Sequence, residues 1–201
     1  MRALWLVALV GCGDDLGQSS KPRLVAWYPM DDVSEAGASD IVGGHDATCA
    51  ACPVLTTGAS NGAYEFDGMQ ELAVPASKEL ELGTLTVSLW LHVDPSANQT
   101  GCALAKGAAW HVCVTQRRVE FDVTLGPAPI DSGRWHHISA TYDGVVQRLQ
   151  IDGKPAAERE AVLMSDAAGL VIGRNYVGRI DEVRIYEGVL DDAALAELTK
   201  P

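Results

Sequence analysis

Residues 84–93 read TLTVSLWLHV. The odd-numbered positions from Leu85 to Val93 are all aliphatic, whereas the even-numbered ones are Thr, Ser, Trp and His. Side chains on a β-strand point alternately to its two faces, so a period of two predicts a long strand with one strongly apolar face. Such a strand must cover that face with a second layer of structure.

Shorter runs of β-type residues lie on both sides of this strand and are separated by turn residues. We expect strands near residues 64–66, 72–74, 119–125, 135–142, 149–151, 170–172 and 178–186. Asp-Gly pairs at 67–68, 143–144 and 152–153 are typical turn residues. This spacing indicates an all-β sandwich, and no repeat of 20–50 residues points to a solenoid or propeller. Residues 190–198, LDDAALAEL, predict one short helix with an acidic first turn.

The composition is that of a chain that buries a core. The 201 residues are 47% hydrophobic and 21% charged, which fits a single folded domain and excludes disorder as the main state. Lys and Arg number 15 against 27 Asp and Glu, giving a formal net charge of -12. This acidity excludes a nucleic-acid partner, and it also excludes docking on anionic lipid through protein charge.

The first twelve residues, MRALWLVALVGC, place one positive residue before a short apolar run and a cysteine. The run is too short to span a bilayer. Residues 9–12, LVGC, resemble the lipobox of bacterial lipoproteins. The resemblance implies a signal peptide at 1–11, a lipidated Cys12 with a tether at 12–22, and a domain at 23–201. It implies a lipid-anchored protein of the bacterial cell envelope, at the outer membrane or cell surface. An ordinary signal peptide with an incidental cysteine and a buried N-terminal strand are the alternatives.

The remaining cysteines suggest two disulfides, as expected of an exported chain. Residues 107–108, Gly-Ala, suit a two-residue hairpin turn that would pair Lys106 with Ala109. Counting back along both strands then places Cys102 opposite Cys113, where the two β-carbons are close enough to bridge.

Cys49 and Cys52 remain as a local pair in the segment Cys-Ala-Ala-Cys-Pro. A redox-active pair of this spacing would precede a helix, and no helical run follows. A zinc site would need more ligands than this segment supplies. We therefore expect a structural disulfide between Cys49 and Cys52.

Taken in order, these segments look like a laminin-G-like domain of the concanavalin A-like jelly-roll superfamily. The resemblance covers nearly all of residues 24–198 and implies an antiparallel β-sandwich jelly roll with a short C-terminal helix. It is carried by LVAWYPMD (24–31), SDIVGGHDAT (39–48), FDG (66–68), TVSLWL (86–91), GRWHHI (133–138), TYDG (141–144), IDGK (151–154), IGR (172–174) and GRIDEVRIY (178–186).

Many domains of this kind hold a calcium ion near the start of the chain. Mapped by motif, the resemblance implies Asp31, Asp40 and Asp181 as ligands, with the carbonyls of Gly44 and Asp46. Calcium takes six to eight oxygen ligands, so this set suits its chemistry. The alternative is that these Asp residues cap turns without a metal. The sequence departs from the family at residues 41–42, Ile-Val, where small polar residues are usual.

The sequence offers little support for catalysis. Residues 120–122, Glu-Phe-Asp, resemble the start of the acidic catalytic strand of β-glucanases in the same superfamily, but no second Glu follows. His136 and His137 are neighbours on a predicted strand, so they point to opposite faces and cannot act together. We expect a protein that is not an enzyme.

The predicted function is binding. Trp110 lies near the tip of the predicted hairpin and is the best candidate for an exposed aromatic ligand contact. We expect a cell-envelope lipoprotein that binds a glycan or a surface protein at loops on the sheet rim. The alternatives are a structural or adhesion module without a small ligand, and a divergent glycoside hydrolase.

Overall fold

The computed structural model describes residues 21–32, 37–97 and 100–200. Cys12, the predicted signal peptide and most of the predicted tether lie outside the described residues. Within the described ranges, no helix is long and apolar enough to cross a membrane.

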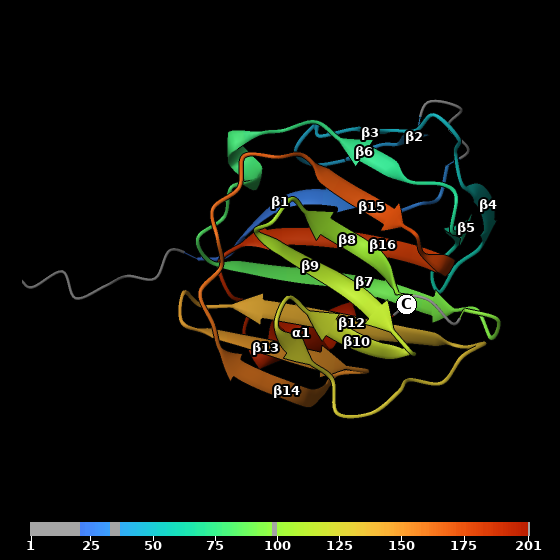
Figure 1. Cartoon of the computed structure of the whole chain (residues 1–201). Coiled ribbons are helices and arrows are strands. Elements are labelled where there is room, and N and C mark those ends of the chain that lie inside the picture. Colours follow the sequence, from blue (N-terminus) through green and yellow to red (C-terminus); the bar gives the residue numbers. More distant parts are fainter. Residues whose placement is uncertain (1–20, 33–36, 98–99, 201) are drawn as a thin grey trace, which may run out of the picture.

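Two antiparallel sheets pack face to face as a β-sandwich, which confirms the predicted fold class (Figure 1). The first sheet has the order β14-β13-β12-β7-β16-β5-β4, and β1 also pairs with β16. Its strands are β1 (Arg23–Tyr28), β4 (Val54–Thr57), β5 (Gly62–Asp67), β7 (Leu85–Val93), β12 (Trp135–Tyr142), β13 (Val146–Ile151), β14 (Lys154–Glu160) and β16 (Val177–Glu187).

The second sheet has the order β11-β10-β9-β8-β15-β6-β3-β2 and faces the viewer in Figure 1. Its strands are β2 (Gly37–Ala38), β3 (Ala47–Thr48), β6 (Leu72–Val74), β8 (Gly101–Lys106), β9 (Trp110–Thr115), β10 (Arg118–Phe121), β11 (Thr124–Leu125) and β15 (Leu170–Arg174). A 3₁₀ turn, η1 (Lys78–Leu80), and one helix, α1 (Asp192–Leu198), complete the described elements.

Strand β7 lies in the middle of the first sheet and carries the core, as its alternation predicts. Its aliphatic residues are fully buried between the sheets. Burying a side chain of this kind contributes roughly 1.5–3 kcal/mol. On the opposite face of β7, Thr86 and Ser88 are buried, whereas Trp90 and His92 are half-buried. The C-terminal segment contacts this face at Thr86. The Leu190 backbone N–H donates to Thr86 Oγ1 at 3.0 Å, and Leu195 of α1 is buried.

The β8–β9 hairpin differs from the prediction by one residue at its tip. Lys106 pairs with Trp110, so the loop has three residues, 107–109, rather than two. A β-bulge just after Cys102 restores the register, and Cys102 pairs with Cys113 as predicted. The structure contains the expected disulfide between them and also the one between Cys49 and Cys52.

The prediction that Trp110 is an exposed ligand contact is wrong. Trp110 is 2% exposed and belongs to the core with Val112 and Val114. The cause is strand alternation: Cys113 points to the outer face of the sheet, and a residue three positions away must point inward.

Candidate functional site

Two of the three predicted metal ligands meet the same loop, which joins β4 to β5. The Gly62 backbone N–H donates to Asp31 Oδ1 at 2.8 Å, and the Ser60 backbone N–H donates to Asp181 Oδ2 at 2.9 Å. Asp31 follows β1 directly, and Asp181 lies where a β-bulge interrupts β16. Residues 150 positions apart in the chain are therefore linked through one short loop.

Asp181 is fully buried, and its second oxygen is unsatisfied. Oδ1 accepts no hydrogen bond from any residue in the described ranges. Burial raises the pKa of Asp181 to about 7, and the neighbouring Glu182 carboxylate adds to the rise. Hydrogen bonds from backbone N–H groups, including that of Ser60, oppose it. A buried carboxylate oxygen without a partner is costly and is suited to a cation ligand. Asp181 and Asp31 therefore fit the calcium site that the family resemblance implies.

Asp40 has a different role in the structure. Its carboxylate is buried and accepts five hydrogen bonds, from the backbone N–H groups of Trp27, Val42, Gly43 and His45 and from His45 Nδ1, all at 2.9–3.1 Å. This leaves neither oxygen free of hydrogen bonds. Asp40 holds the loop that follows β2, as the turn-capping alternative describes.

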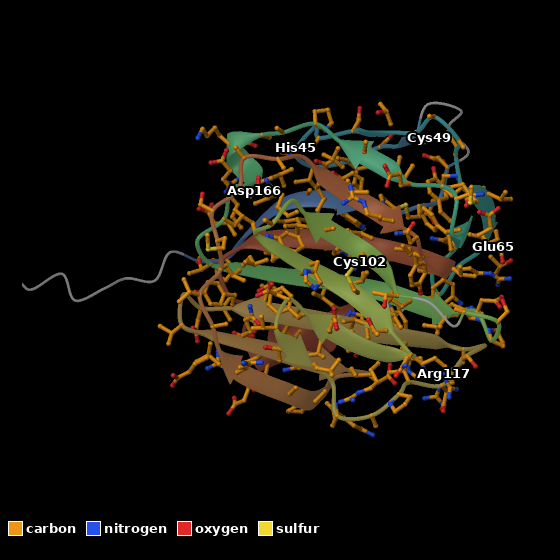
Figure 2. All side chains as sticks on the ribbon, in the orientation of Figure 1. His45, Cys49, Glu65, Cys102, Arg117 and Asp166 are labelled. Carbon is orange, nitrogen blue, oxygen red and sulfur yellow. A yellow bond between two sulfur atoms is a disulfide. The ribbon has the colours of Figure 1, made fainter. Side chains whose placement is uncertain are left out.

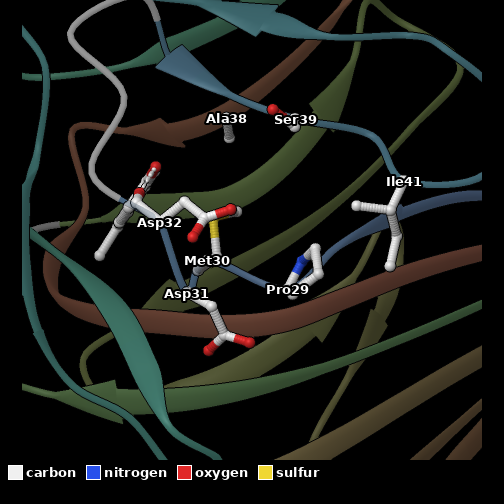
Figure 3. A pocket seen from close by; sticks show the side chains of 8 residues that line it. Pro29, Met30, Asp31, Asp32, Ala38, Ser39 and Ile41 are labelled. Atoms are coloured by element: carbon white, nitrogen blue, oxygen red, sulfur yellow. Dashed lines mark hydrogen bonds between the residues drawn. The ribbon is translucent and has the colours of Figure 1, made fainter.

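A cavity of about 200 Å³ opens beside Asp31 at this end of the sandwich (Figure 3). Its two walls are the segment after β1 and the segment after β2. The lining residues are Pro29, Met30, Asp31, Asp32, Ala38, Ser39, Ile41 and Tyr64. In Figure 3 the Asp32 carboxylate points into the space between the walls, whereas that of Asp31 points away from it. Ile41 is 56% exposed, so the cavity has an apolar side facing solvent.

The walls of this rim cavity are fixed by Tyr64 of β5. Its hydroxyl donates to the carbonyl of Asp32 at 2.7 Å and also lies 3.1 Å from the carbonyl of Gly37. One buried phenol thus connects both walls to the sheet. Among the described residues, none donates a hydrogen bond to the Asp32 carboxylate, which leaves it available to a ligand.

The sequence did not single out the cavity residues other than Asp31. Two features of the sequence could have pointed to these cavity residues. Asp31 is followed by a second carboxylate, Asp32, and residues 41–42 are apolar where the family is usually polar. The partnership of Tyr64 with both walls has no signature in the sequence.

The acidic residues that resemble a catalytic strand do not act as a pair. Glu120 lies on the outer face of β10 with its Oε1 3.2 Å from His111 Nε2. Asp122 lies beyond the end of β10 in a left-handed conformation, φ 50°, and accepts a hydrogen bond from Gln147 Nε2 at 2.8 Å. The two carboxylates therefore serve separate contacts.

The two adjacent histidines also have separate partners, as their strand positions predict. His136 Nδ1 lies 2.9 Å from Asp152 Oδ2, and His137 Nε2 lies 2.9 Å from Ser88 Oγ. Burial lowers the pKa of His137 to about 4, so its imidazole is neutral at ordinary pH.

The sequence matches one family model over about two thirds of its length. A family model described as the concanavalin A-like lectin/glucanases superfamily matches residues 66–196. The chain belongs to this superfamily. The matched range includes Asp181 but begins after Asp31 and Asp40. No curated protein matches the sequence significantly.

Solved structures share the superfamily fold at low sequence identity. Domain 4 of AbnA, a GH43 extracellular arabinanase from Geobacillus stearothermophilus, solved with arabinotriose, superposes with a TM-score of 0.69 at 20% identity. The superposition covers 89% of this chain and 98% of that one.

Two further structures match only a part of a longer protein. The binding domain of Paraclostridial Mosquitocidal Protein 1 superposes with a TM-score of 0.70 at 12% identity, over 88% of this chain and 52% of that one. A Trypanosoma rangeli sialidase in complex with sialic acid gives 0.67 at 14% identity, over 88% of this chain and 32% of that one. At these identities the likeness shows the fold alone.

Proposed function

We propose that this domain is a non-catalytic glycan-binding module that takes the end of a neutral glycan in the rim cavity. The observation that carries the proposal is the cavity itself, lined by the exposed apolar Ile41 and by Asp32, whose carboxylate receives no hydrogen bond from the residues that the structure describes. Carboxylates accept hydrogen bonds from sugar hydroxyls, and these charge-assisted bonds are stronger than neutral ones. Apolar side chains such as Ile41 and Pro29 can pack against the C–H face of a sugar ring.

The size and the charge of the cavity restrict the class of glycan that it can bind. A cavity of about 200 Å³ is smaller than the roughly 300–1,000 Å³ typical of sites that enclose drug-sized ligands. It suits one terminal sugar rather than an enclosed chain. The Asp32 carboxylate, which points into the cavity, repels anionic sugars, and this favours a neutral glycan. The arabinotriose bound in the AbnA domain is a neutral sugar, and this supports the proposal.

Replacing Asp32 with Asn is expected to weaken binding of a neutral oligosaccharide about tenfold, because a charge-assisted hydrogen bond becomes a neutral one. Replacing Ile41 with Ala is expected to act in the same direction. The ligand is first identified on an array of neutral and anionic glycans with residues 22–201, and affinity is then measured by titration calorimetry. Glu158→Gln and Val162→Ala, two exposed sites outside the cavity lining, are the matched controls. The proposal fails if no glycan binds, or if both cavity variants bind as the wild type does.

We propose also that calcium binds between Asp31 and Asp181, with the unpartnered Oδ1 of Asp181 as the supporting observation. An ion that binds only the folded state stabilises it by about 2.7 kcal/mol at a hundredfold excess over its dissociation constant. Calcium chloride is therefore expected to raise the melting temperature at pH 7.5 relative to EDTA, and Asp181→Asn is expected to abolish the rise. Identical melting curves with calcium and with EDTA would rule the ion out.

The proposed location is the bacterial cell envelope, with lipid on Cys12 as the anchor. The support is the order of Arg2, an apolar run and Cys12 at the start of the chain. In this setting a glycan of the envelope or of a host surface lies within reach of the domain.

A further inference from the structure

We propose that reduction of the Cys102–Cys113 disulfide converts the outer face of the second sheet into a zinc site. The ligands are the two freed thiolates, the imidazole of His111 and the carboxylate of Glu120. This site is separate from the rim cavity, and the proposal does not depend on glycan or calcium binding.

The register of three adjacent strands brings the four side chains together. Cys113 of β9 pairs with Cys102 of β8 on one side and with Glu120 of β10 on the other. His111 is two residues from Cys113 on β9, so it points to the same face. Cys102 lies near the centre of the sheet that faces the viewer in Figure 2.

Distances between the ligand atoms are close to those that zinc needs. One ligand atom from each of His111, Cys113 and Glu120 lies within 4.8 Å of the others, and the Cys102 sulfur is bonded to that of Cys113. Tetrahedral zinc with bonds of about 2.0–2.3 Å places its ligand atoms about 3.3–3.8 Å apart. Side-chain rotation alone can therefore close the site. Within the described ranges, no other group of three or more His, Cys, Asp or Glu side chains comes this close.

The oxidation state of the sulfurs decides whether the site exists. Zinc binds negatively charged thiolates, whereas the sulfur atoms of a disulfide are uncharged and are poor zinc ligands. A dithiol reductant transfers two electrons and two protons to the Cys102–Cys113 bond and becomes a disulfide itself. The S–S bond breaks, two thiols form, and both lose their protons when zinc binds. Oxidation reverses these steps and releases the ion.

Part of the site is open to solvent, so an ion can reach it. The side chains of His111 and Glu120 are 33% and 26% exposed. His111 Nε2 already lies 3.2 Å from Glu120 Oε1, close to the separation of two ligand atoms on one zinc ion. The other disulfide, between Cys49 and Cys52, is not part of such a group of His and carboxylate side chains in the described structure.

The test measures zinc binding to residues 22–201 with Cys49→Ser and Cys52→Ser, a variant that lacks Cys12 as well and so retains only Cys102 and Cys113. Zinc is titrated against a chromogenic competitor with and without the phosphine reductant TCEP, and cobalt replaces zinc for absorption spectra. We expect one ion per chain after reduction and none before it. Cobalt is expected to give thiolate charge-transfer absorption and the intense visible bands of a tetrahedral site. His111→Ala and Glu120→Gln are each expected to weaken binding about tenfold or more.

The proposal is overturned if the reduced protein binds no zinc, or if the His111 and Glu120 variants bind as tightly as their parent. If reduction unfolds the chain, zinc is expected to restore the strand signal in circular dichroism, because metal binding is then coupled to folding. Failure to restore it also overturns the proposal. The Cys102→Ser variant cannot form the Cys102–Cys113 disulfide and provides a second test. It is expected to bind zinc without reductant, and a failure to bind zinc would contradict the proposed site.

Discussion

In EDTA, the stabilising contribution of Asp181 is expected to fall by about 4 kcal/mol between pH 4 and pH 8. The pKa of this carboxyl is about 7 in the folded protein, against 3.8 for an ordinary Asp, and each unit corresponds to about 1.36 kcal/mol. The folded state therefore holds the proton more tightly than the unfolded state. The contribution is fully present below the unfolded pKa and is lost as pH rises through 7.

The measurement is the free energy of unfolding by urea, for the wild type and for Asp181→Asn, at several pH values. Other carboxyl groups titrate in the same range, so the difference between the two proteins is the informative quantity. Asp181→Asn is expected to gain about 4 kcal/mol relative to the wild type as pH rises from 4 to 8. Parallel curves for the two proteins would contradict this expectation.

Asp143 provides a control of opposite sign. The hydrogen bond from Arg148 is the main cause that lowers the pKa of Asp143 to about 2, and backbone N–H groups of the following turn assist. Its stabilising contribution is therefore present above the unfolded pKa and is lost as pH falls toward 2. Asp143→Asn is expected to lose stability relative to the wild type as pH rises from about 2 to 4, and to run parallel to the wild type above pH 4, where Asp181→Asn gains stability.

Asp40→Ala is expected to lower the free energy of unfolding by about 3–5 kcal/mol, because it leaves buried donors without an acceptor. Four backbone N–H groups and the ring of His45 lose their partner at once. Denaturation by urea with an unchanged m-value is the measurement. Asp131→Ala, at a carboxylate that is 71% exposed, is the control and is expected to change stability by less than about 0.5 kcal/mol.

The effect of Asp40→Ala is also expected to depend on pH. Burial acts to raise the pKa of Asp40, but the hydrogen bonds from Trp27, His45, Val42 and Gly43 outweigh it and lower the pKa. The contribution is therefore present above the unfolded pKa and is lost as pH falls through the folded one. The difference between the wild type and Asp40→Ala should shrink in acid. A loss below about 1 kcal/mol at pH 7 would show that the loop can satisfy its donors without this residue.

The sheet pattern could be predicted from the sequence because it depends on local alternation. The aliphatic face of β7 has to be covered by a second layer of structure, and the second sheet covers it. The tip of the β8–β9 hairpin could not be predicted in the same way. A two-residue and a three-residue loop are both compatible with Gly107, whose φ is 52°, and the bulge after Cys102 absorbs the difference. The Cys102–Cys113 disulfide is nevertheless predicted correctly, because the bulge restores the expected pairing at Cys102.

The roles of the three aspartates could be predicted only in part. A motif can place a carboxylate near a loop, but the path of the loop decides which N–H groups reach it. The loop after β2 folds around Asp40 and donates hydrogen bonds to both oxygens of its carboxylate. The loop between β4 and β5, in contrast, donates a hydrogen bond to only one oxygen of Asp181. The cavity beside them depends on Tyr64, which lies 32 and 27 residues along the chain from the carbonyls of Asp32 and Gly37 that it contacts.

The pairing of β1 with β16 also bears on how the domain resists a mechanical force applied to its N-terminus. Residue 22 adjoins the start of β1, and the wall of the rim cavity begins directly after its last residue, Tyr28. With the proposed anchor at Cys12 and the proposed glycan in the cavity, a pull between the two would act along the axis of β1. The hydrogen bonds to β16 run perpendicular to that axis, so they are loaded together in shear rather than broken one after another. The fold places the rim cavity and residue 22 at opposite ends of one strand that is paired along its length.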